Sequence, residues 1–243
     1  MLNYVLLKKS QLEDIGEALR YKLDVEDQFL VDDMAEAVLN IGNGETFIGG
    51  ENGFYDVGKY SKFIQGAILQ GASKIEFGWN YTSSTRVDVD SFALFLQNGK
   101  LYPSTNNDMT NTIYYAHMRH SPDNSYLNTD NTQGSFSGEG TLEIITLYLD
   151  EIPEQFTEIV LGCHIYYPLG SFDFGDIPHC FMSMEDVGSK KKYRYNITND
   201  YSGYTSLIFG SLLRIGKRKR WRFIPNEIPG HYTRVPELSN SFR

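Results

Sequence analysis

From Lys74 to Ile228, apolar and polar residues alternate in short runs separated by clusters of Gly, Asn, Asp and Pro. Because side chains alternate between the two faces of a strand, such runs predict half-buried β-strands. Nine runs follow this pattern: residues 74–81, 91–102, 111–118, 141–153, 158–168, 180–186, 191–197, 206–215 and 221–228. Short strands with turn residues between them are typical of a β-sandwich, so we expect a mainly β fold.

The first forty residues have a helical period instead. Ser10 and Glu13 form a capping-box pattern before apolar residues at helical spacing, and a second helical pattern ends at Gly42. Two short helices bury little surface, so we expect them to pack on each other and on a neighbouring chain. The predicted parts are a helical N-terminal module with a short strand segment (1–65), a sandwich (66–230) and a polar tail that orders on a neighbour (231–243).

One strand pattern contains an unusual pair of carboxylates. Asp88 and Asp90 alternate with two valines, and three large apolar residues continue on the aspartates' side of the strand. Two neighbouring carboxylates repel each other and are costly to desolvate unless they are paired. Two interpretations stay open: strand pairing begins only at Ser91 and leaves both aspartates in a solvated turn, or a cation binds them.

The N-terminal pattern resembles a helical repeat of tail-associated proteins from bacteriophages and prophages. The stretch LEDIGEALRYKLDVEDQFLVDDMAEAVLNI (12–41) has the helix pair of that repeat, and ENGFYDVGKY (51–60) resembles the segment that often follows it. Leu23 departs from the repeat, which has a threonine before its turn. The resemblance implies a module that docks to a virion or tail assembly.

The strand region resembles the TerD family, the calcium-binding β-sandwich of bacterial tellurite-resistance and stress-response operons. The stretches that carry the resemblance are FGWN (77–80), VDVDSFALFLQNGK (87–100), SPDNSYLNTDNTQG (121–134), GTLEIITLYLDEIPEQFTEIVL (140–161), FDFGDIPHCFMSM (172–184), SLIFGSLLRI (206–215) and WRF (221–223). Their order and spacing agree with the family over most of the predicted sandwich.

The resemblance also implies a calcium site, although the family's pattern is only partly present. Asn80 and His179 stand where the family has Asp and Asn, and the family's acidic Gly-Asp-Asp-Glu cluster is Gly-Thr-Leu-Glu (140–143) here. Ca²⁺ takes six to eight oxygen ligands from carboxylates, amides and loop carbonyls. The expected ligands of a structural Ca²⁺ are Asp88, Asp90, Asp130, Asn131 and Glu143.

Composition narrows the classes of function. The chain has 243 residues and a net charge of −9, which argues against nucleic-acid binding. Its apolar runs are too short to span a bilayer, and its N-terminus lacks the order of a signal peptide. Cys163 and Cys180 are too few for a disulfide scaffold, so we expect free thiols in strands.

Other candidate sites have simpler interpretations. His117 and His120 are three residues apart without cysteine partners, so a zinc site there is disfavoured. His164 and His179 are interpreted as packed polar residues, and the basic run 217–222 as a solvated hairpin tip. The chain contains no nucleophile elbow, P-loop, dinucleotide fingerprint or metalloprotease helix. We therefore expect no catalytic residues and a protein that is not an enzyme.

Three functional hypotheses follow. The first is a structural component of a phage or prophage tail, located in the virion, that contacts other phage proteins or its own copies. The second is a TerD-type calcium-binding stress protein in the cytoplasm of a bacterial host. The third is a carbohydrate-binding module for a host surface glycan. The N-terminal resemblance favours the first.

Overall fold

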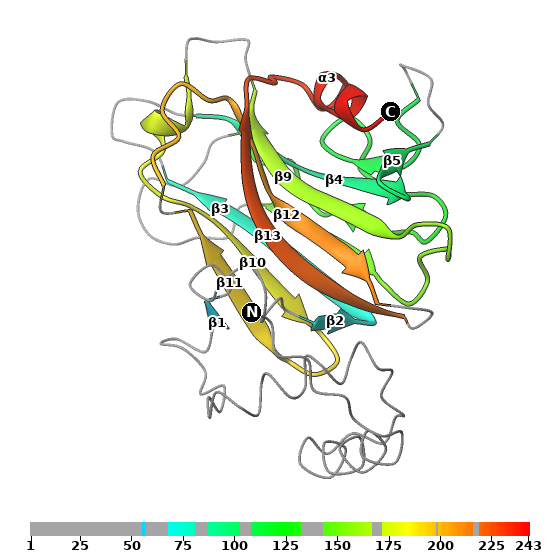
Figure 1. Ribbon diagram of the computed structural model, residues 1–243. Coiled ribbons are helices and arrows are strands. Elements are labelled where there is room, and N and C mark those ends of the chain that lie inside the picture. Colours follow the sequence, from blue (N-terminus) through cyan, green and yellow to red (C-terminus); the bar gives the residue numbers. More distant parts are fainter. Residues whose placement is uncertain are drawn as a thin grey trace, which may run out of the picture. The chain divides into compact units, whose positions relative to one another are not determined.

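In the computed structural model, residues 55–56, 68–80, 87–102, 108–132, 143–166, 172–197, 199–215 and 219–243 are described, and the fold is mainly β. The first of its two sheets has six strands, antiparallel except for the pair β1–β11. Their order is β1 (Tyr55–Asp56), β11 (Lys192–Asn196), β10 (Cys180–Asp186), β3 (Ala72–Trp79), β8 (Glu143–Tyr148) and β7 (Tyr126–Leu127). The first four are labelled in Figure 1.

The second sheet has seven strands, all antiparallel to their neighbours. Their order is β2 (Ile68–Gln70), β13 (Arg220–Gly230), β12 (Ser206–Arg214), β9 (Glu158–Ile165), β4 (Val89–Gln97) and β5 (Lys100–Leu101), with β6 (Thr112–Ile113) also paired to β4. All nine predicted strand runs contain a strand of one of the two sheets, so the prediction of a mainly β fold is confirmed.

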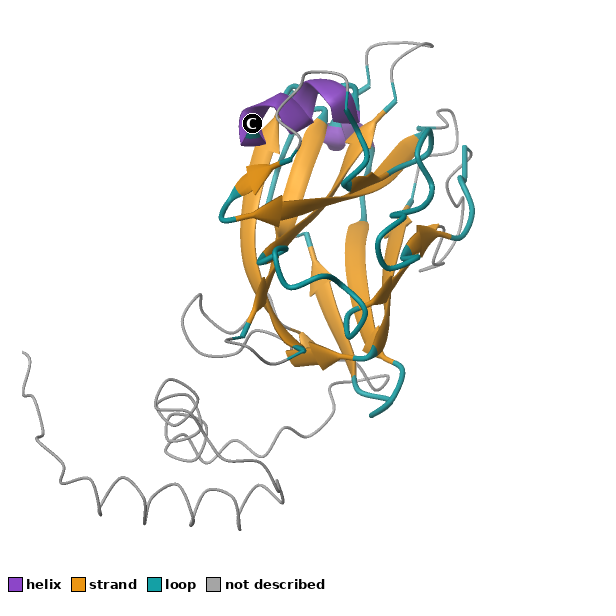
Figure 2. Cartoon of the chain, turned by 90° about the vertical axis from the view of Figure 1, so that its right-hand side faces the viewer, coloured by secondary structure: helices purple, strands orange, loops and turns teal. Residues whose placement is uncertain are grey.

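Figure 2 shows the strands of the two sheets, and side chains from both sheets form one large hydrophobic core. Alternation directs every second side chain of each strand into this core, as for Ile75 and Phe77 of β3 and Leu207 and Phe209 of β12. The rings of Phe77 and Phe209 meet edge to face across the core, with centroids 5.7 Å apart. Burial of apolar surface between the sheets is the main source of stability in such a fold.

Strand β4 is buried on both faces. Val89, Ala93 and Phe95 lie in the core between the sheets, whereas Phe92, Leu94 and Leu96 belong to a second hydrophobic cluster on the outer face of the second sheet. This second cluster contains Phe92, Leu94, Leu96, Leu101, Tyr114, Val160, Ile208, Val235 and Leu238. The short helix α3 (Val235–Ser239) supplies its last two members and covers this face near the C-terminus (Figure 1).

The C-terminal segment therefore differs from the polar tail expected from its sequence. Val235 and Leu238 are 0% and 2% exposed and pack within the same chain, followed by a 3-10 helix at Asn240–Phe242. A five-residue helix with two apolar side chains is too short for a periodicity signal, which explains why the sequence pattern did not predict it.

The predicted N-terminal module, residues 1–65, lies outside the described residues except for Tyr55 and Asp56 in β1. Its two helices and the phage-type repeat that they resemble therefore stay predictions.

A short 3-10 helix, Phe174–Asp176, precedes β10, and the side chain of Asp173 caps its N-terminus.

Replacing Gly162 of β9 by Ala is expected to destabilise the protein by about 1–3 kcal/mol through overpacking. The added Cβ would lie 2.5 Å from the carbonyl oxygen of Leu207 and 2.5 Å from Cζ of Phe92. Urea unfolding measures the change, with Gly188→Ala as the control, because its Cβ would meet nothing closer than Asp186 Oδ1 at 3.4 Å. An unchanged midpoint for the Gly162 variant would contradict this packing.

Candidate metal centre

The aspartate pair lies at the start of β4. Because the strand begins at Val89, Asp90 is a strand residue and is only 3% exposed. Asp88 immediately precedes the strand and is partly buried, and its carbonyl oxygen accepts a hydrogen bond from the Tyr166 N–H at 2.9 Å. The interpretation that pairing begins at Ser91 and leaves both aspartates in a solvated turn is therefore wrong.

A buried glutamate from the other sheet reaches the same place. Glu143, the first residue of β8, is fully buried and faces the interior. Its Oε2 accepts a hydrogen bond from the Ser91 N–H at 2.8 Å, and its Oε1 accepts one from the Asn131 N–H at 3.1 Å. One carboxylate thus connects β4, β8 and the loop that follows β7.

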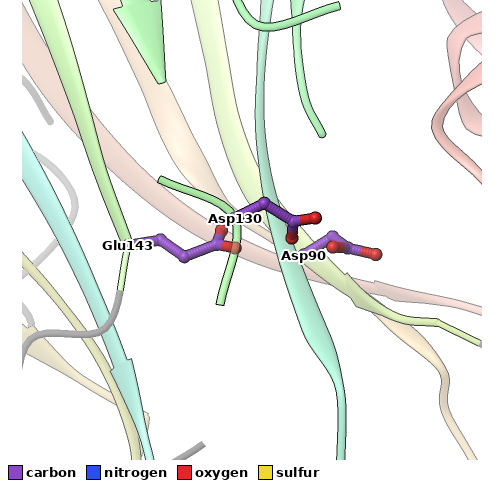
Figure 3. Close-up of side chains that lie close together, drawn as sticks. All are labelled: Asp90, Asp130 and Glu143. Atoms are coloured by element: carbon purple, nitrogen blue, oxygen red, sulfur yellow. The ribbon is translucent and has the colours of Figure 1, made fainter. Parts of the chain in front are cut away.

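That loop brings a third carboxylate to the site. The Asn128 N–H donates to the Ile144 carbonyl at 2.8 Å, which fixes the start of the loop beside β8. Asp130 follows on this loop and is exposed. One carboxylate oxygen each from Asp90, Asp130 and Glu143 lies within 4.8 Å of the other two, as Figure 3 shows for the three side chains.

Burial and mutual repulsion make these carboxyl groups hard to ionise. Burial, followed by the charges of Asp88, Glu143 and Asp130, raises the pKa of Asp90 to about 9. Burial also raises the pKa of Glu143 to about 7, although hydrogen bonds from Ser91 and Asn131 partly oppose it. The pKa of Asp88 is raised to about 6 by burial and by the charge of Asp130. A group of carboxyls with raised pKa values is a candidate cation site.

The residues present fit a divalent cation. Asp88 Oδ1 and Asp90 Oδ2 are buried and have no hydrogen-bond partner among the described residues. Buried oxygens without partners are costly, and a cation would satisfy them and remove the repulsion between the carboxylates. The donor set consists of oxygens, which are the ligands that Ca²⁺ and Mg²⁺ prefer.

The five residues that the sequence predicts as calcium ligands do not all take part in the cluster in the same way. Asp90, Asp130 and Glu143 come together, and the charge of Asp88 acts on Asp90. Asn131 contributes its backbone N–H, which holds Glu143 in place. Whether these residues bind a metal stays a prediction.

A polar residue outside the predicted ligand set also lies beside Asp90. His164 of β9 is paired with Asp90 of β4, and its Nε2 lies 3.6 Å from Asp90 Oδ2. The ring is fully buried, and neither nitrogen has a hydrogen-bond partner among the described residues. Burial lowers the pKa of His164 to about 4, so the imidazole is neutral at pH 7. Only the pairing of β4 with β9 could have pointed to it.

The two histidines near residue 120 have other partners. His120 Nδ1 lies 2.6 Å from Asp123 Oδ2, its Nε2 lies 3.1 Å from Asn111 Oδ1, and its ring stacks on Phe95. His117 Nδ1 lies 2.7 Å from the carbonyl oxygen of Thr112. Both ring nitrogens of His120 are therefore occupied by protein oxygens, which makes it a structural residue.

Two further sequence predictions can be compared with the structure. Cys163 in β9 and Cys180 in β10 are free and buried, which confirms free thiols in strands. Residues 220–222 of the basic run lie at the start of β13, which pairs with β12, and residues 217–218 of the run lie outside the described part. No helix among the described residues is long and apolar enough to cross a membrane.

Fold and site together define a class of protein: a two-sheet β-protein with a carboxylate cluster suited to a divalent cation. The TerD domain family matches residues 69–229, which is more than half of the chain. The chain therefore belongs to the TerD family, and the predicted resemblance of its strand region is confirmed.

Curated relatives and solved structures agree with this assignment. The chain is 30% identical over 139 residues to stress response protein SCP2 of Bacillus subtilis (strain 168), a match that covers 56% of this chain and 65% of SCP2. It is 28% identical over 155 residues to the tellurium resistance protein TerD of Serratia marcescens, covering 61% of this chain and 76% of TerD. The match thus spans just under two thirds of SCP2 and about three quarters of TerD.

A solved structure shares the fold. The crystal structure of the protein SAV2460, whose function is unknown, has a TM-score of 0.52 and 18% sequence identity to this chain. The alignment covers 70% of this chain and 95% of SAV2460. At this identity the similarity shows the fold alone.

Proposed function

We propose that this protein is a non-enzymatic, divalent-cation-binding protein of the TerD type, with a role in a stress or tellurium-resistance response. The observation that carries the proposal is the cluster of Asp90, Asp130 and Glu143, whose carboxylate oxygens lie within 4.8 Å of one another. Relatives named for stress response and tellurium resistance support the setting. The cation expected from the sequence is Ca²⁺.

The bound cation would stabilise the structure by joining separate parts of the chain. Asp90 belongs to the second sheet, Glu143 to the first, and Asp130 to the loop after β7. A cation bound by all three would join both sheets to this loop, with Asp88 adding a further negative charge nearby. Binding would therefore order this end of the protein and present it in a defined form to a partner, without a chemical reaction.

Calcium is expected to stabilise the intact chain by about 2.7 kcal/mol at about a hundred times its dissociation constant, because a ligand of the native state shifts the folding equilibrium. Thermal unfolding in millimolar Ca²⁺ and in a chelator should differ by roughly 5–10 °C. The Asp90→Asn variant should show no such difference. Equal unfolding temperatures of the intact chain with and without Ca²⁺, Mg²⁺ and Mn²⁺ would reject the proposal.

The phage-tail hypothesis is kept as a second candidate, because the resemblance that motivates it concerns residues 12–60, mostly outside the described part. The family match and the named relatives fit the TerD-type alternative better. Fractionation separates the two hypotheses: co-purification with induced phage particles favours a virion component, and a particle-free cytoplasmic pool favours a stress protein. Specific binding to host wall polysaccharide would instead favour the carbohydrate-binding module.

A further inference from the structure

Lysine residues are concentrated at one end of the sandwich. The six lysines among the described residues all lie at or near the strand ends opposite the carboxylate cluster: Lys74, Lys100, Lys190, Lys191, Lys192 and Lys219. Strand β8 connects the two ends, because it begins at Glu143 in the cluster and finishes at Tyr148, beside the start of β3. A strand of six residues is about 17 Å long, which exceeds the Debye length of about 8 Å at physiological ionic strength. The two ends therefore act on charged partners independently.

Two of the lysine-bearing hairpins meet at the turn between β2 and β3. Asp186, at the end of β10, pairs with Ser73 of β3. Arg220, at the start of β13, pairs with Gln70 of β2. Gly71 is the single residue between β2 and β3, so the β10–β11 hairpin of the first sheet and the β12–β13 hairpin of the second lie on either side of it. Figure 1 shows the end of β10 beside β2.

Four cations on these two hairpins form a surface that we call the basic end: Lys190, Lys191, Lys219 and Arg220. The three lysines are exposed and form no ion pair with any described residue, and Arg220 is half-buried beside them. A hydrogen bond to the carbonyl oxygen of Lys191, at 3.0 Å, closes the first hairpin, and one to the carbonyl oxygen of Arg220, at 2.9 Å, closes the second. The backbone thus holds these cations at the end of the sandwich.

Acidic residues do not neutralise the basic end. The turns of the two hairpins, residues 187–191 and 215–219, contain no acidic residue. Glu185 is paired with Lys192 at 3.5 Å, and Asp150 accepts a hydrogen bond from the backbone of the β2–β3 turn. Two exposed acids, Glu151 and Glu154, lie in the neighbouring β8–β9 turn and leave an excess of positive charge on the hairpins.

We propose that the basic end docks reversibly on an anionic phospholipid surface. This inference goes beyond the proposed cation-binding function and does not rest on it. Each lysine or arginine close to an anionic bilayer strengthens binding roughly fivefold, so several of them on two hairpins make a weak but additive contact. Lysine is suited to this contact, because its compact charge on a flexible stem reaches phosphate groups without a fixed geometry.

A bilayer fits the basic end better than a nucleic acid does. Trp221 is fully buried, with the guanidinium of Arg214 4.3 Å from its ring centroid, so it is not available to stack on a base. Proteins hold nucleic-acid strands in a charged groove, whereas hairpin turns at the end of a sandwich are convex. A flat bilayer also meets these turns alone, so the rest of a chain with a net charge of −9 stays away from the lipid phosphates.

The test measures sedimentation of the full chain with lipid vesicles in the presence of a chelator. Vesicles of phosphatidylcholine with phosphatidylglycerol are compared with vesicles of phosphatidylcholine alone. The double variant Lys190→Gln, Lys219→Gln should bind the anionic vesicles roughly thirtyfold more weakly than the intact chain, because one charge is lost from each hairpin. The matched control Arg119→Gln, Arg234→Gln removes two exposed charges outside the hairpins and should stay within about threefold of the intact chain.

Four results would overturn the proposal. Equal binding of the intact chain and the hairpin variant to anionic vesicles would exclude the basic end, and equal binding to both kinds of vesicle would exclude an electrostatic contact. Binding only after addition of Ca²⁺ would assign the contact to an ion that bridges the carboxylate cluster and the lipid. Binding of a DNA duplex instead of vesicles, lost in the hairpin variant, would assign the surface to nucleic acid. Stabilisation by Ca²⁺ is measured without vesicles, so the proposed function stands or falls separately.

Lysine acetylation of the intact chain tests the same contact without a variant. Mass spectrometry follows the modification of Lys190, Lys191 and Lys219 with anionic vesicles and with phosphatidylcholine vesicles. Slower acetylation of these lysines on anionic vesicles alone, reversed at about 0.5 M salt, supports the proposal because salt screens the contact. Unchanged acetylation of the three lysines while the chain is bound to anionic vesicles would overturn it.

Discussion

Replacing Asp90 by Asn is expected to stabilise the cation-free protein at pH 7 by on the order of 2–4 kcal/mol, while removing its response to Ca²⁺. The pKa of Asp90 is about 9 in the folded protein, mainly because of burial, against 3.8 as its ordinary value. At pH 7 folding must therefore drive a proton onto this carboxyl group, and the amide of Asn does not require one. The empty cation site thus destabilises the folded protein, and Asp90→Asn removes this cost together with the ability to bind Ca²⁺.

The pH dependence of the cation-free protein follows from the same shift. A carboxyl group with a raised pKa stabilises the fold below its unfolded value and loses that contribution as pH rises through its folded value. The advantage of Asp90→Asn over the intact chain should therefore be close to zero near pH 4 and grow up to about pH 9. Between these pH values, the difference in free energy of unfolding between Asp90→Asn and the intact chain should rise by about 1.4 kcal/mol per pH unit.

Urea unfolding in chelator from pH 4 to pH 9 measures this difference. Glu151→Gln, which removes an exposed carboxylate, serves as the control and should stay within about 0.5 kcal/mol of the intact chain. Because Ca²⁺ must displace protons from Asp90 and Glu143, its affinity should fall as pH is lowered from 9 to 6. A variant that is less stable than the intact chain at pH 8 without cations would contradict the burial of this carboxyl group.

Removing one side chain of the C-terminal helix should have an effect of similar size. Leu238→Ala is expected to cost about 2–5 kcal/mol, because Leu238 is 2% exposed in the outer hydrophobic cluster. The change opens a cavity above Phe92 and Leu94, the outward-facing residues of β4. Chemical unfolding followed by tryptophan fluorescence measures the loss.

The neighbouring residue provides the control for this prediction. Glu237 is exposed on the same helix, so Glu237→Ala should change the free energy of unfolding by no more than about 0.5 kcal/mol. If Leu238→Ala were equally harmless, α3 would not be part of the folded domain. The segment would then behave as the polar tail that its sequence suggests.

Local patterns identified some features of this protein without a structure. Alternation in the nine runs predicted the strands, because side-chain direction along a strand depends only on neighbouring residues. The same alternation singled out Asp88 and Asp90, and the family resemblance added Asp130 and Glu143. Three of these four carboxylates share one site in the folded chain.

Other features depended on contacts between residues far apart in the chain. Strand register places His164 opposite Asp90, and α3 covers the outer face of β4. Both the burial of Asp90 and the orphaned ring of His164 follow from these contacts. Periodicity and the family resemblance thus predicted the strands and four candidate carboxylates, whereas the meeting of three of them at one site, with His164 beside Asp90, became visible only in the packed fold. Periodicity and charge are local properties of the chain, while register and burial depend on contacts between distant segments.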